Sequence, residues 1–520
     1  MVWRKSVGGI VVLAALLVSA CASSTPTGQQ STGTPAASVG HFAKNACPFK
    51  VDSSLVEGKD VTCGTLTVPE DRQKPQGNIE QLAVATYKNP SATSPDPVIY
   101  LQGGPGGGAV YDFAPIINAN DRSIFLGHHD LILIDQRGTG YSKPSLQCSE
   151  TNALQFQTDV NLTAQQSIDL NDKALATCHD RLVSQHINLS AYSTYNSAND
   201  IHDLIQAMGY QSVNLWGISY GTRLAQEVMR SFPQHIRSVV LDSTVPPTMI
   251  NLTSVPRTMA HDLNLMYTTC AAEPTCNAKY PNLQAEFESL LAKLNTNPIT
   301  FSATDQDQDA ADPNIGKSFN VLFHGSDLLN LVFEVFYQTF LIPTLPQLID
   351  QVNNGNYTDL LAKYDGQINF NTALSIGLYY SIRCSEETEF TTADAVAQAS
   401  QVYPTPVRSD ETLYQQADIA ICQNWGVPKA PAVQRQPVTS SIPTLILQGE
   451  FDPITPSPNG ETIAKTLSAS YFFQFPGTGH GVFASEKTLC GDKIRVAFQD
   501  TPQQKPSSTC IAALGEPQFT

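Results

Sequence analysis

One serine of this chain stands between two glycines, in the stretch Gly217-Ile218-Ser219-Tyr220-Gly221. The residues before it are typical of a buried strand, and the apolar residues after it recur with a helical period. A serine at a sharp strand-to-helix turn can act as a nucleophile, because flanking glycines let the backbone turn without a clash. Acyl transfer also needs a base, an acid that orients the base, and donors for an oxyanion.

The base and the acid follow two later strand-like segments. His480 lies in YFFQFPGTGHG, where flanking glycines leave room for an imidazole, and Asp452 lies in TLILQGEFDP. The order serine, acid, histidine is the order found in hydrolases with a Gly-x-Ser-x-Gly turn. We therefore predict Ser219, Asp452 and His480 as the catalytic residues, with Glu450 as the alternative acid.

Oxyanion donors are predicted in the glycine-rich segment LQGGPGGG, residues 101–108. Glycines present backbone N–H groups without a Cβ in the way, which suits a loop beside a developing negative charge. We expect the N–H groups of Gly104 and Tyr220 to bind the oxyanion. The segment has neither the Gly-Lys-Ser/Thr ending of a phosphate-binding loop nor the Gly-x-Gly-x-x-Gly spacing of a dinucleotide site.

The elements that must position these residues alternate along the chain. Helical patterns over residues 199–210 and 220–232 separate apolar runs that show little polar alternation. This pattern indicates an α/β fold, with a mostly parallel sheet covered by helices on both faces. Before residue 250 the predicted strands lie at residues 65–69, 82–87, 97–102, 131–136, 212–217 and 238–242.

The hydrophobic pattern changes from about residue 250. From there, helical stretches and a polar segment, ATDQDQDAADPN, replace the predicted strands. Two strand-then-loop units return near the carboxyl end, so an insertion into a single sheet explains the order. The predicted organisation is a hydrolase core over 45–249, a helical cap over 250–410 and the rest of the core over 411–520.

The amino-terminal residues indicate export. Arg4 and Lys5 precede an apolar run over 7–17 that is too short to span a bilayer but suits a signal peptide. The following VSAC resembles a bacterial lipobox, in which Cys21 carries the lipid. We predict a signal peptide over 1–20, a flexible tether over 21–44 and a cell-envelope lipoprotein. An ordinary signal peptide is the alternative.

The chain has 11 cysteines, so lipidation of Cys21 leaves ten that can all pair. The ten lie as near neighbours along the chain. No Cys-x-x-Cys or Cys/His cluster at ligand spacing occurs, so neither a metal nor an organic cofactor is expected. The expected disulfides are Cys47–Cys63, Cys148–Cys178, Cys270–Cys276, Cys384–Cys422 and Cys490–Cys510.

The net charge of the chain limits the classes of partner that it is expected to bind. The chain has 47 acidic and 30 basic side chains and a formal net charge of −17. An excess of negative charge argues against nucleic acid and against an anionic membrane surface, and it favours cationic partners. Contact with a membrane is expected only through the lipid.

Five segments occurring together resemble a known family, the α/β-hydrolase peptidases that include proline iminopeptidase and secreted tripeptidyl aminopeptidases. In chain order they are GGPGGG, DQRGTGYS, GISYGT, GEFDPITP and GTGHG. The resemblance implies an exported serine aminopeptidase that cleaves peptides with free N-termini through an acyl-enzyme. Gln102 stands where proline iminopeptidases have a histidine, and we interpret Arg137 as a structural residue of the DQRGTG turn.

A substrate ammonium group held in a partly dry cleft needs a carboxylate beside it. In SIRCSEETEF, Glu386 and Glu387 follow a cysteine expected to tie the cap to the core, and we predict that they bind this group. A solvated acidic surface is the alternative interpretation. A carboxylesterase or lipase with the same triad, and a non-catalytic surface lipoprotein, are the alternative functions.

Overall fold

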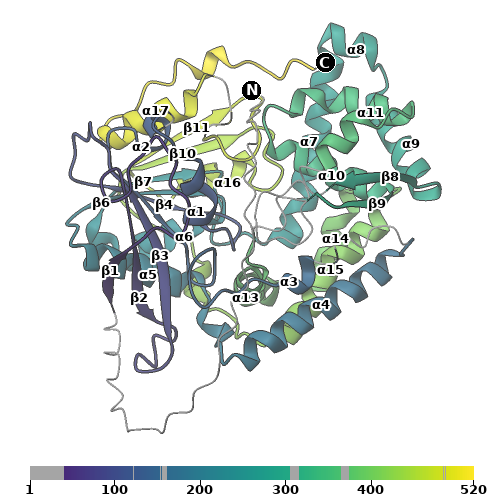
Figure 1. Cartoon of the computed structure of the whole chain (residues 1–520). Coiled ribbons are helices and arrows are strands. Elements are labelled where there is room, and N and C mark those ends of the chain that lie inside the picture. The colour runs from purple at the N-terminus through teal and green to yellow at the C-terminus, as the bar shows by residue number, and fades with distance from the viewer. Residues whose placement is uncertain are drawn as a thin grey trace, which may run out of the picture. The chain divides into compact units, whose positions relative to one another are not determined.

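A central β-sheet surrounded by helices organises the structure (Figure 1). The computed structural model describes residues 40–519, apart from residues 121, 153, 155–160, 305–315, 365–373, 484 and 486–487. The described residues belong to one compact unit, Ser38–Thr520. The predicted signal peptide, Cys21 and most of the predicted tether lie outside them.

Nine strands of the described part form this sheet, in the order β1-β2-β3-β5-β4-β6-β7-β10-β11. The six strands from β5 to β11 in this order are parallel, and β3, β2 and β1 add to β5 antiparallel at one edge. The strands are β1 (His41–Asn45), β2 (Val61–Pro69), β3 (Ile79–Tyr87), β4 (Val98–Leu101), β5 (Leu131–Ile134), β6 (Val213–Ile218), β7 (Ile236–Asp242), β10 (Thr444–Gly449) and β11 (Ser470–Phe475).

Helices cover both faces of the sheet, and strand β4 shows how. Its alternate residues Ile99 and Leu101 pack with α5 and α6, whereas Tyr100 packs with α1, α2 and α17 on the opposite face. Because successive side chains of a strand point to opposite faces, a strand buried on both sides is apolar throughout. The predicted α/β class is confirmed. The core helices are α1 (Ala109–Phe113), α2 (Arg122–Leu126), α5 (Thr194–Met208), α6 (Tyr220–Ser231), α16 (Ser457–Ala464) and α17 (Cys490–Asp500).

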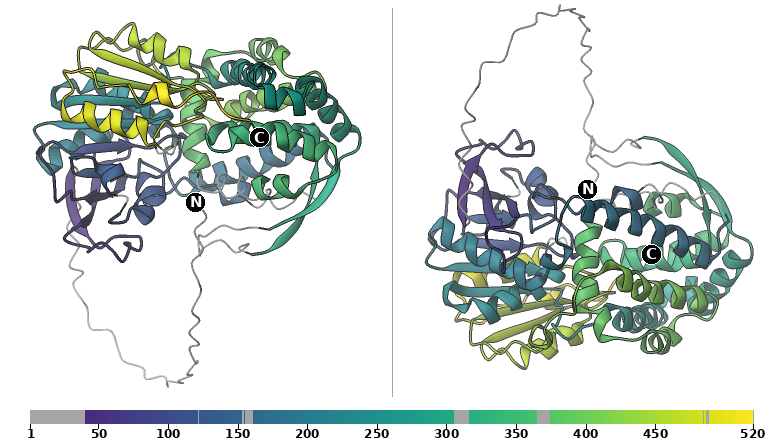
Figure 2. Two further views of the ribbon diagram at one scale, coloured as in Figure 1. Left: turned by 90° about the horizontal axis from the view of Figure 1, so that it is seen from above. Right: turned by 90° about the horizontal axis from the view of Figure 1, so that it is seen from below.

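A second layer of helices lies between β7 and β10 in the chain and beside the sheet in space (Figures 1 and 2). We call helices α7 to α15 the cap helices. Many of them share an apolar core of their own, which reaches Phe451 in the loop after β10. They are α7 (Asn251–Ala272), α8 (Pro274–Lys279), α9 (Leu283–Thr296), α10 (Gly325–Tyr337), α11 (Leu345–Asn353), α13 (Ile376–Glu386), α14 (Ala393–Ala399) and α15 (Arg408–Trp425).

Two more helices, α3 (Ser149–Asn152) and α4 (Ala164–Ser184), come from between β5 and β6. Helix α4 packs against α15, with its Leu175 and Leu182 in the same apolar cluster as Trp425. The helical layer therefore uses residues that the sequence assigned to the core, and α15 extends beyond the predicted cap boundary at residue 410.

Two pairings were missed by the sequence analysis. Strand β1 begins at His41, within the range predicted as tether, and pairs with β2. Strands β8 (Ile299–Thr304) and β9 (Ser318–Phe323) form an antiparallel hairpin inside the region predicted to be helical. Both are partly exposed, so neither has the continuous apolar run that revealed the buried strands.

Five disulfides join the nearest-neighbour pairs that the sequence favoured: Cys47–Cys63, Cys148–Cys178, Cys270–Cys276, Cys384–Cys422 and Cys490–Cys510. The Cys384–Cys422 bond links α13 to α15, and Cys148–Cys178 links the start of α3 to α4. Among the described helices, none is both long enough and apolar enough to cross a membrane.

Candidate active site

Ser219 lies at the turn between β6 and α6, with φ 55° and ψ −126°. A positive φ is uncommon for a residue with a Cβ and persists only where the surrounding structure holds it. Its N–H donates to the carbonyl of Asp242 at 2.9 Å. This backbone strain at a serine is the feature expected of a nucleophile elbow.

The flanking glycines are required by close backbone contacts. A Cβ on Gly221 would lie 1.9 Å from the carbonyl oxygen of Leu101, and a Cβ on Gly217 would lie 2.4 Å from the carbonyl oxygen of Gly221. A side chain at Gly221 would push the turn away from the end of β4, and one at Gly217 would push apart the strand and the helix that the turn joins. The spacing of Gly-x-Ser-x-Gly therefore has a steric cause here.

The glycine-rich loop after β4 lies directly against the nucleophile. A Cβ on Gly103 would lie 2.8 Å from the Cβ of Ser219. The next residue, Gly104, has φ 116°, which favours glycine. Tyr220 is the first residue of α6, where an N–H has no partner within the helix. Both predicted oxyanion donors thus belong to residues adjacent to this contact.

Gln102 holds this loop by hydrogen bonds, although it replaces a histidine of proline iminopeptidases. The hydroxyl of Tyr100 donates to Gln102 Oε1 at 2.7 Å, and Gln102 Nε2 donates to Asp112 Oδ2 at 2.9 Å. Gln136 Nε2 donates to the Gln102 carbonyl at 2.9 Å. The side chain is therefore a structural support for the loop.

Asp452 and His480 form a hydrogen-bonded pair at the ends of β10 and β11. His480 Nδ1 lies 2.9 Å from Asp452 Oδ1 and 3.0 Å from Oδ2, and the Asp452 side chain is fully buried. Asp452 also accepts the hydroxyl of Thr455 at 2.7 Å. Glu450, the alternative acid, instead accepts the N–H of Gly477 at 3.0 Å. Of the two candidate acids, Asp452 is the one hydrogen-bonded to the histidine.

Electrostatics favour the protonated form of His480. Burial alone would lower the pKa of its imidazole, but the Asp452 carboxylate raises it, and Asp242 and Glu334 act in the same direction, so the pKa lies above its ordinary value. A neutral imidazole is needed to accept a proton. The ability of His480 to act as a base is therefore lost as pH falls through this raised pKa.

Asp242, which the sequence analysis missed as a site residue, connects the serine turn to the histidine loop. Its carboxylate accepts the N–H groups of Val482 at 2.8 Å and Phe483 at 2.9 Å, and the neighbouring Ser243 Oγ accepts the N–H of Gly481 at 2.8 Å. Three consecutive amides after His480 are thereby held by the end of β7. An acid at the carboxyl end of a predicted parallel strand was the signal available.

The end of cap helix α10 closes over His480. The ring of Tyr337 lies 4.7 Å from the imidazole, edge to face, and Gly479 N–H donates to Thr339 Oγ1 at 3.0 Å. Glu334 lies one turn before Tyr337 and interacts with the charge of His480. Burial raises the pKa of Glu334 to about 7. In the described part of the chain, no basic side chain forms an ion pair with Glu334.

Glu386 and Glu387 lie at the end of α13 and are both buried. Arg223 of α6 forms an ion pair with each, at 3.0 Å to Glu386 and 3.6 Å to Glu387. Glu386 also accepts the N–H and the hydroxyl of Thr194, both at 2.8 Å. Because both carboxylates are buried, they are not a solvated surface, and they share the guanidinium of Arg223. Their predicted role in binding a substrate ammonium stays a prediction.

Arg137 is structural, as the sequence analysis interpreted it. Its fully buried guanidinium donates to both oxygens of Asp200 at 2.7 Å, and to the carbonyls of Glu70 and Ala191 at 2.9 Å. These bonds tie the turn after β5 to helix α5 and to the end of β2.

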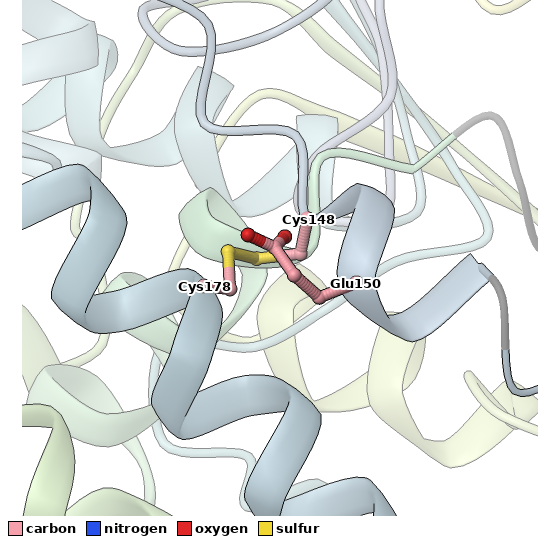
Figure 3. A group of neighbouring side chains, drawn as sticks. All are labelled: Cys148, Glu150 and Cys178. Atoms are coloured by element: carbon pink, nitrogen blue, oxygen red, sulfur yellow. A yellow bond between two sulfur atoms is a disulfide. The ribbon is translucent and has the colours of Figure 1, made fainter.

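One group of described residues has the types and spacing of metal ligands: Cys148, Glu150 and Cys178. Figure 3 shows the sulfur–sulfur bond between the two cysteines, with the Glu150 carboxylate beside it. Cysteines in a disulfide have no thiolate to offer a metal. Glu150 is bound by Arg181 at 2.7 Å. This group is therefore a structural link and not a metal centre.

The family model described as alpha/beta hydrolase fold matches residues 96–487, and the chain therefore belongs to the α/β hydrolase fold family. It is a serine hydrolase of that family.

Serine protease Hip1 of Mycobacterium tuberculosis is 22% identical over 458 residues, which cover 84% of each chain. Tripeptidyl aminopeptidase of Streptomyces lividans is 30% identical over 203 residues, 36% of each chain. Carboxylesterase B of Mycobacterium tuberculosis is 26% identical over 494 residues, 91% of this chain and 90% of that protein.

Replacing Gly221 by alanine tests the steric basis of the turn. Because the new Cβ would overlap the Leu101 carbonyl at 1.9 Å, we expect Gly221→Ala to lower the unfolding free energy by about 3 kcal/mol and to slow labelling of the serine by a fluorophosphonate probe. Gly209→Ala is the control, because Gly209 also has a positive φ of 73° but open space around its Cβ position. It should cost about 1 kcal/mol and leave labelling unchanged. A Gly221→Ala protein as stable and as reactive as wild type would contradict the argument.

Proposed function

We propose that this chain is an exported serine peptidase that hydrolyses peptide bonds near free N-termini, an aminopeptidase of tripeptidyl or prolyl type. The observation that carries the proposal is the buried Asp452–His480 pair beside the strained turn of Ser219. The peptidase names of two relatives support peptides as the substrate class. A carboxylesterase with the same triad is the alternative, supported by the similarity to carboxylesterase B.

In this mechanism Asp452 holds Nδ1 of His480, which leaves Nε2 to accept the Ser219 hydroxyl proton. Ser219 Oγ forms a bond to the carbonyl carbon, and the carbonyl electrons move onto the oxygen, where the N–H groups of Gly104 and Tyr220 bind it. The C–N bond then breaks, and the leaving amine takes the proton from His480. Water attacks the resulting ester with His480 as base, which releases the acyl product and restores Ser219.

Glu334 is our proposed partner for the substrate ammonium. It is partly buried near His480, and it has no paired cation among the described residues. A substrate ammonium would supply the missing positive charge and would favour the ionised form of the carboxyl. An ester without an amine would gain nothing from Glu334, so this residue separates the aminopeptidase from the carboxylesterase alternative.

Loss of the nucleophile tests the chemistry itself. Ser219→Ala should abolish labelling by a fluorophosphonate probe and lower kcat by several powers of ten, since the triad acts as a unit. Ser184→Ala, at an exposed serine near the end of α4, is the matched control and should change neither quantity. Labelling that persists in Ser219→Ala would refute the assignment, and the alternative of a non-catalytic surface lipoprotein predicts no turnover by wild type.

Charge removal at Glu334 tests the preference for free N-termini. Glu334→Gln should lower kcat/KM for a free peptide by about 2 kcal/mol or more, while the N-acetylated form of the same peptide should change little. Glu389→Gln, at an exposed cap glutamate, serves as the control. Equal losses on both peptides would remove Glu334 from the ammonium site and would leave the triad assignment untouched.

Export as a lipoprotein is proposed from the amino-terminal residues, which lie outside the described part. The five disulfides support an oxidising compartment, where such bonds form and persist.

The lipid anchor can be tested by fractionation. Cys21→Ser lacks the thiol that would carry the lipid, so the variant should move from the membrane pellet to the soluble fraction. Ser23→Ala is the control and should stay with the membrane. A Cys21→Ser protein that fractionates like wild type would contradict lipidation.

A further inference from the structure

A cavity of about 490 Å³ lies among helices α4, α10 and α15, next to the β8–β9 hairpin. Ser326 and Asp327 line it from the first turn of α10, and Asp410 lines it from the first turn of α15. Helix α10 ends at Tyr337, beside His480. The cavity and the proposed active site are therefore at opposite ends of the same helix.

A second cavity, of about 380 Å³, adjoins the first. The two cavities share Leu154 and Ser167 in their linings, and Ile376 and Tyr379 of α13 line the second one. Helix α13 begins beside the glycine-rich loop, where the N–H of Ser375 donates to the carbonyl of Gly106 at 3.0 Å. The two cavities are therefore neighbours, and helix α13 lies between the second cavity and the glycine-rich loop in the chain of contacts.

The larger cavity is acidic. Asp327 and Asp410 line it, and the described residues of its lining include neither lysine nor arginine. His324 is the one lining residue that can carry positive charge, and its Nδ1 lies 3.4 Å from Asp327 Oδ2. A further acid, Glu411, is buried next to Asp410, and burial together with the two aspartates raises the pKa of its carboxyl to about 8. Among these described groups, negative charge exceeds positive charge.

A separate observation points to a ligand in the same place. Ser326 is only 7% exposed, and its Oγ has no hydrogen-bond partner in the described part of the chain. A buried hydroxyl without a partner is unfavourable, because it has lost its hydrogen bonds to water. A bound group that carries N–H donors would satisfy both this hydroxyl oxygen and the aspartates.

We propose that this acidic cavity is a second binding site for the substrate, which takes the side chain of a lysine or arginine located several residues from the scissile bond. The inference rests on peptides being the substrates. Helix α10 has 13 residues, so its ends lie about 18 Å apart at 1.5 Å per residue. An extended peptide covers about 3.4 Å per residue, so the basic residue would stand about five positions from the bond that is cut, on its carboxyl side, because the proposed aminopeptidase leaves too few residues on the amino side.

Matched peptides can test this site. A series with a free N-terminus carries a single lysine moved stepwise along an otherwise neutral sequence, and each peptide has a glutamine counterpart. We expect the ratio of kcat/KM for lysine over glutamine to peak at about tenfold when the lysine stands about five residues from the cut. Asp410→Asn should reduce this ratio toward one. Asp394→Asn, at an exposed acid in the first turn of α14, should leave it unchanged.

A binding measurement on protein that cannot hydrolyse the peptide tests this site independently of the proposed function. Ser219→Ala protein should bind the lysine peptide more tightly than its glutamine counterpart in calorimetry, and Asp410→Asn in that background should remove the difference. If Ser219→Ala protein prefers the lysine peptide but the wild-type protein hydrolyses neither peptide, the binding site is supported and the peptidase function is refuted. Hydrolysis without any lysine preference would refute the site and retain the peptidase. Cadaverine that binds as tightly as the lysine peptide would assign the cavity to free diamines and overturn the substrate assignment.

Discussion

The contact between the end of β4 and the start of α6 is the constraint on which the site depends. The carbonyl of Leu101 lies so near Gly221 that a Cβ there would come within 1.9 Å of the oxygen. Two residues after Leu101, Gly103 lies close to Ser219, which is two residues before Gly221. Backbones this close hold the serine at its positive φ, which would otherwise relax. They also place the glycine-rich loop beside the nucleophile without any side chain between them.

The remaining groups gather because parallel strands end at one edge of the sheet. Strands β6, β7, β10 and β11 are neighbours in the sheet, and each supplies one residue just at or beyond its carboxyl end: Ser219, Asp242, Asp452 and His480. Asp242 binds two of these loops, since its carbonyl accepts from Ser219 and its carboxylate accepts from the loop after His480. A shift of β7 would therefore move the nucleophile and the base together.

The parts of this arrangement that the sequence revealed are those set by local patterns. Continuous apolar runs marked the buried strands, and glycine spacing marked the turn of Ser219. Local patterns could not reveal the surroundings of Glu386. Its neighbours Thr194 and Arg223 are far away in the sequence, and they contact it only because α13 packs on α5 and α6. Strand β1 and the β8–β9 hairpin lacked a signal because exposed strands need no apolar run.

Three carboxyl groups of this structure have different surroundings, and the surroundings decide what each group does. Asp452 is buried with an imidazole and three further donors, so its charge orients a base. Glu386 is buried with Arg223, so its charge ties a cap helix to the core. Glu334 is withdrawn from water with no cation of its own among the described residues, and burial raises its pKa. A buried charge without a partner is costly. Of these three carboxyl groups, Glu334 is the one without an ion-pair partner among the described residues, and its raised pKa lets protonation remove the charge where no cation is present.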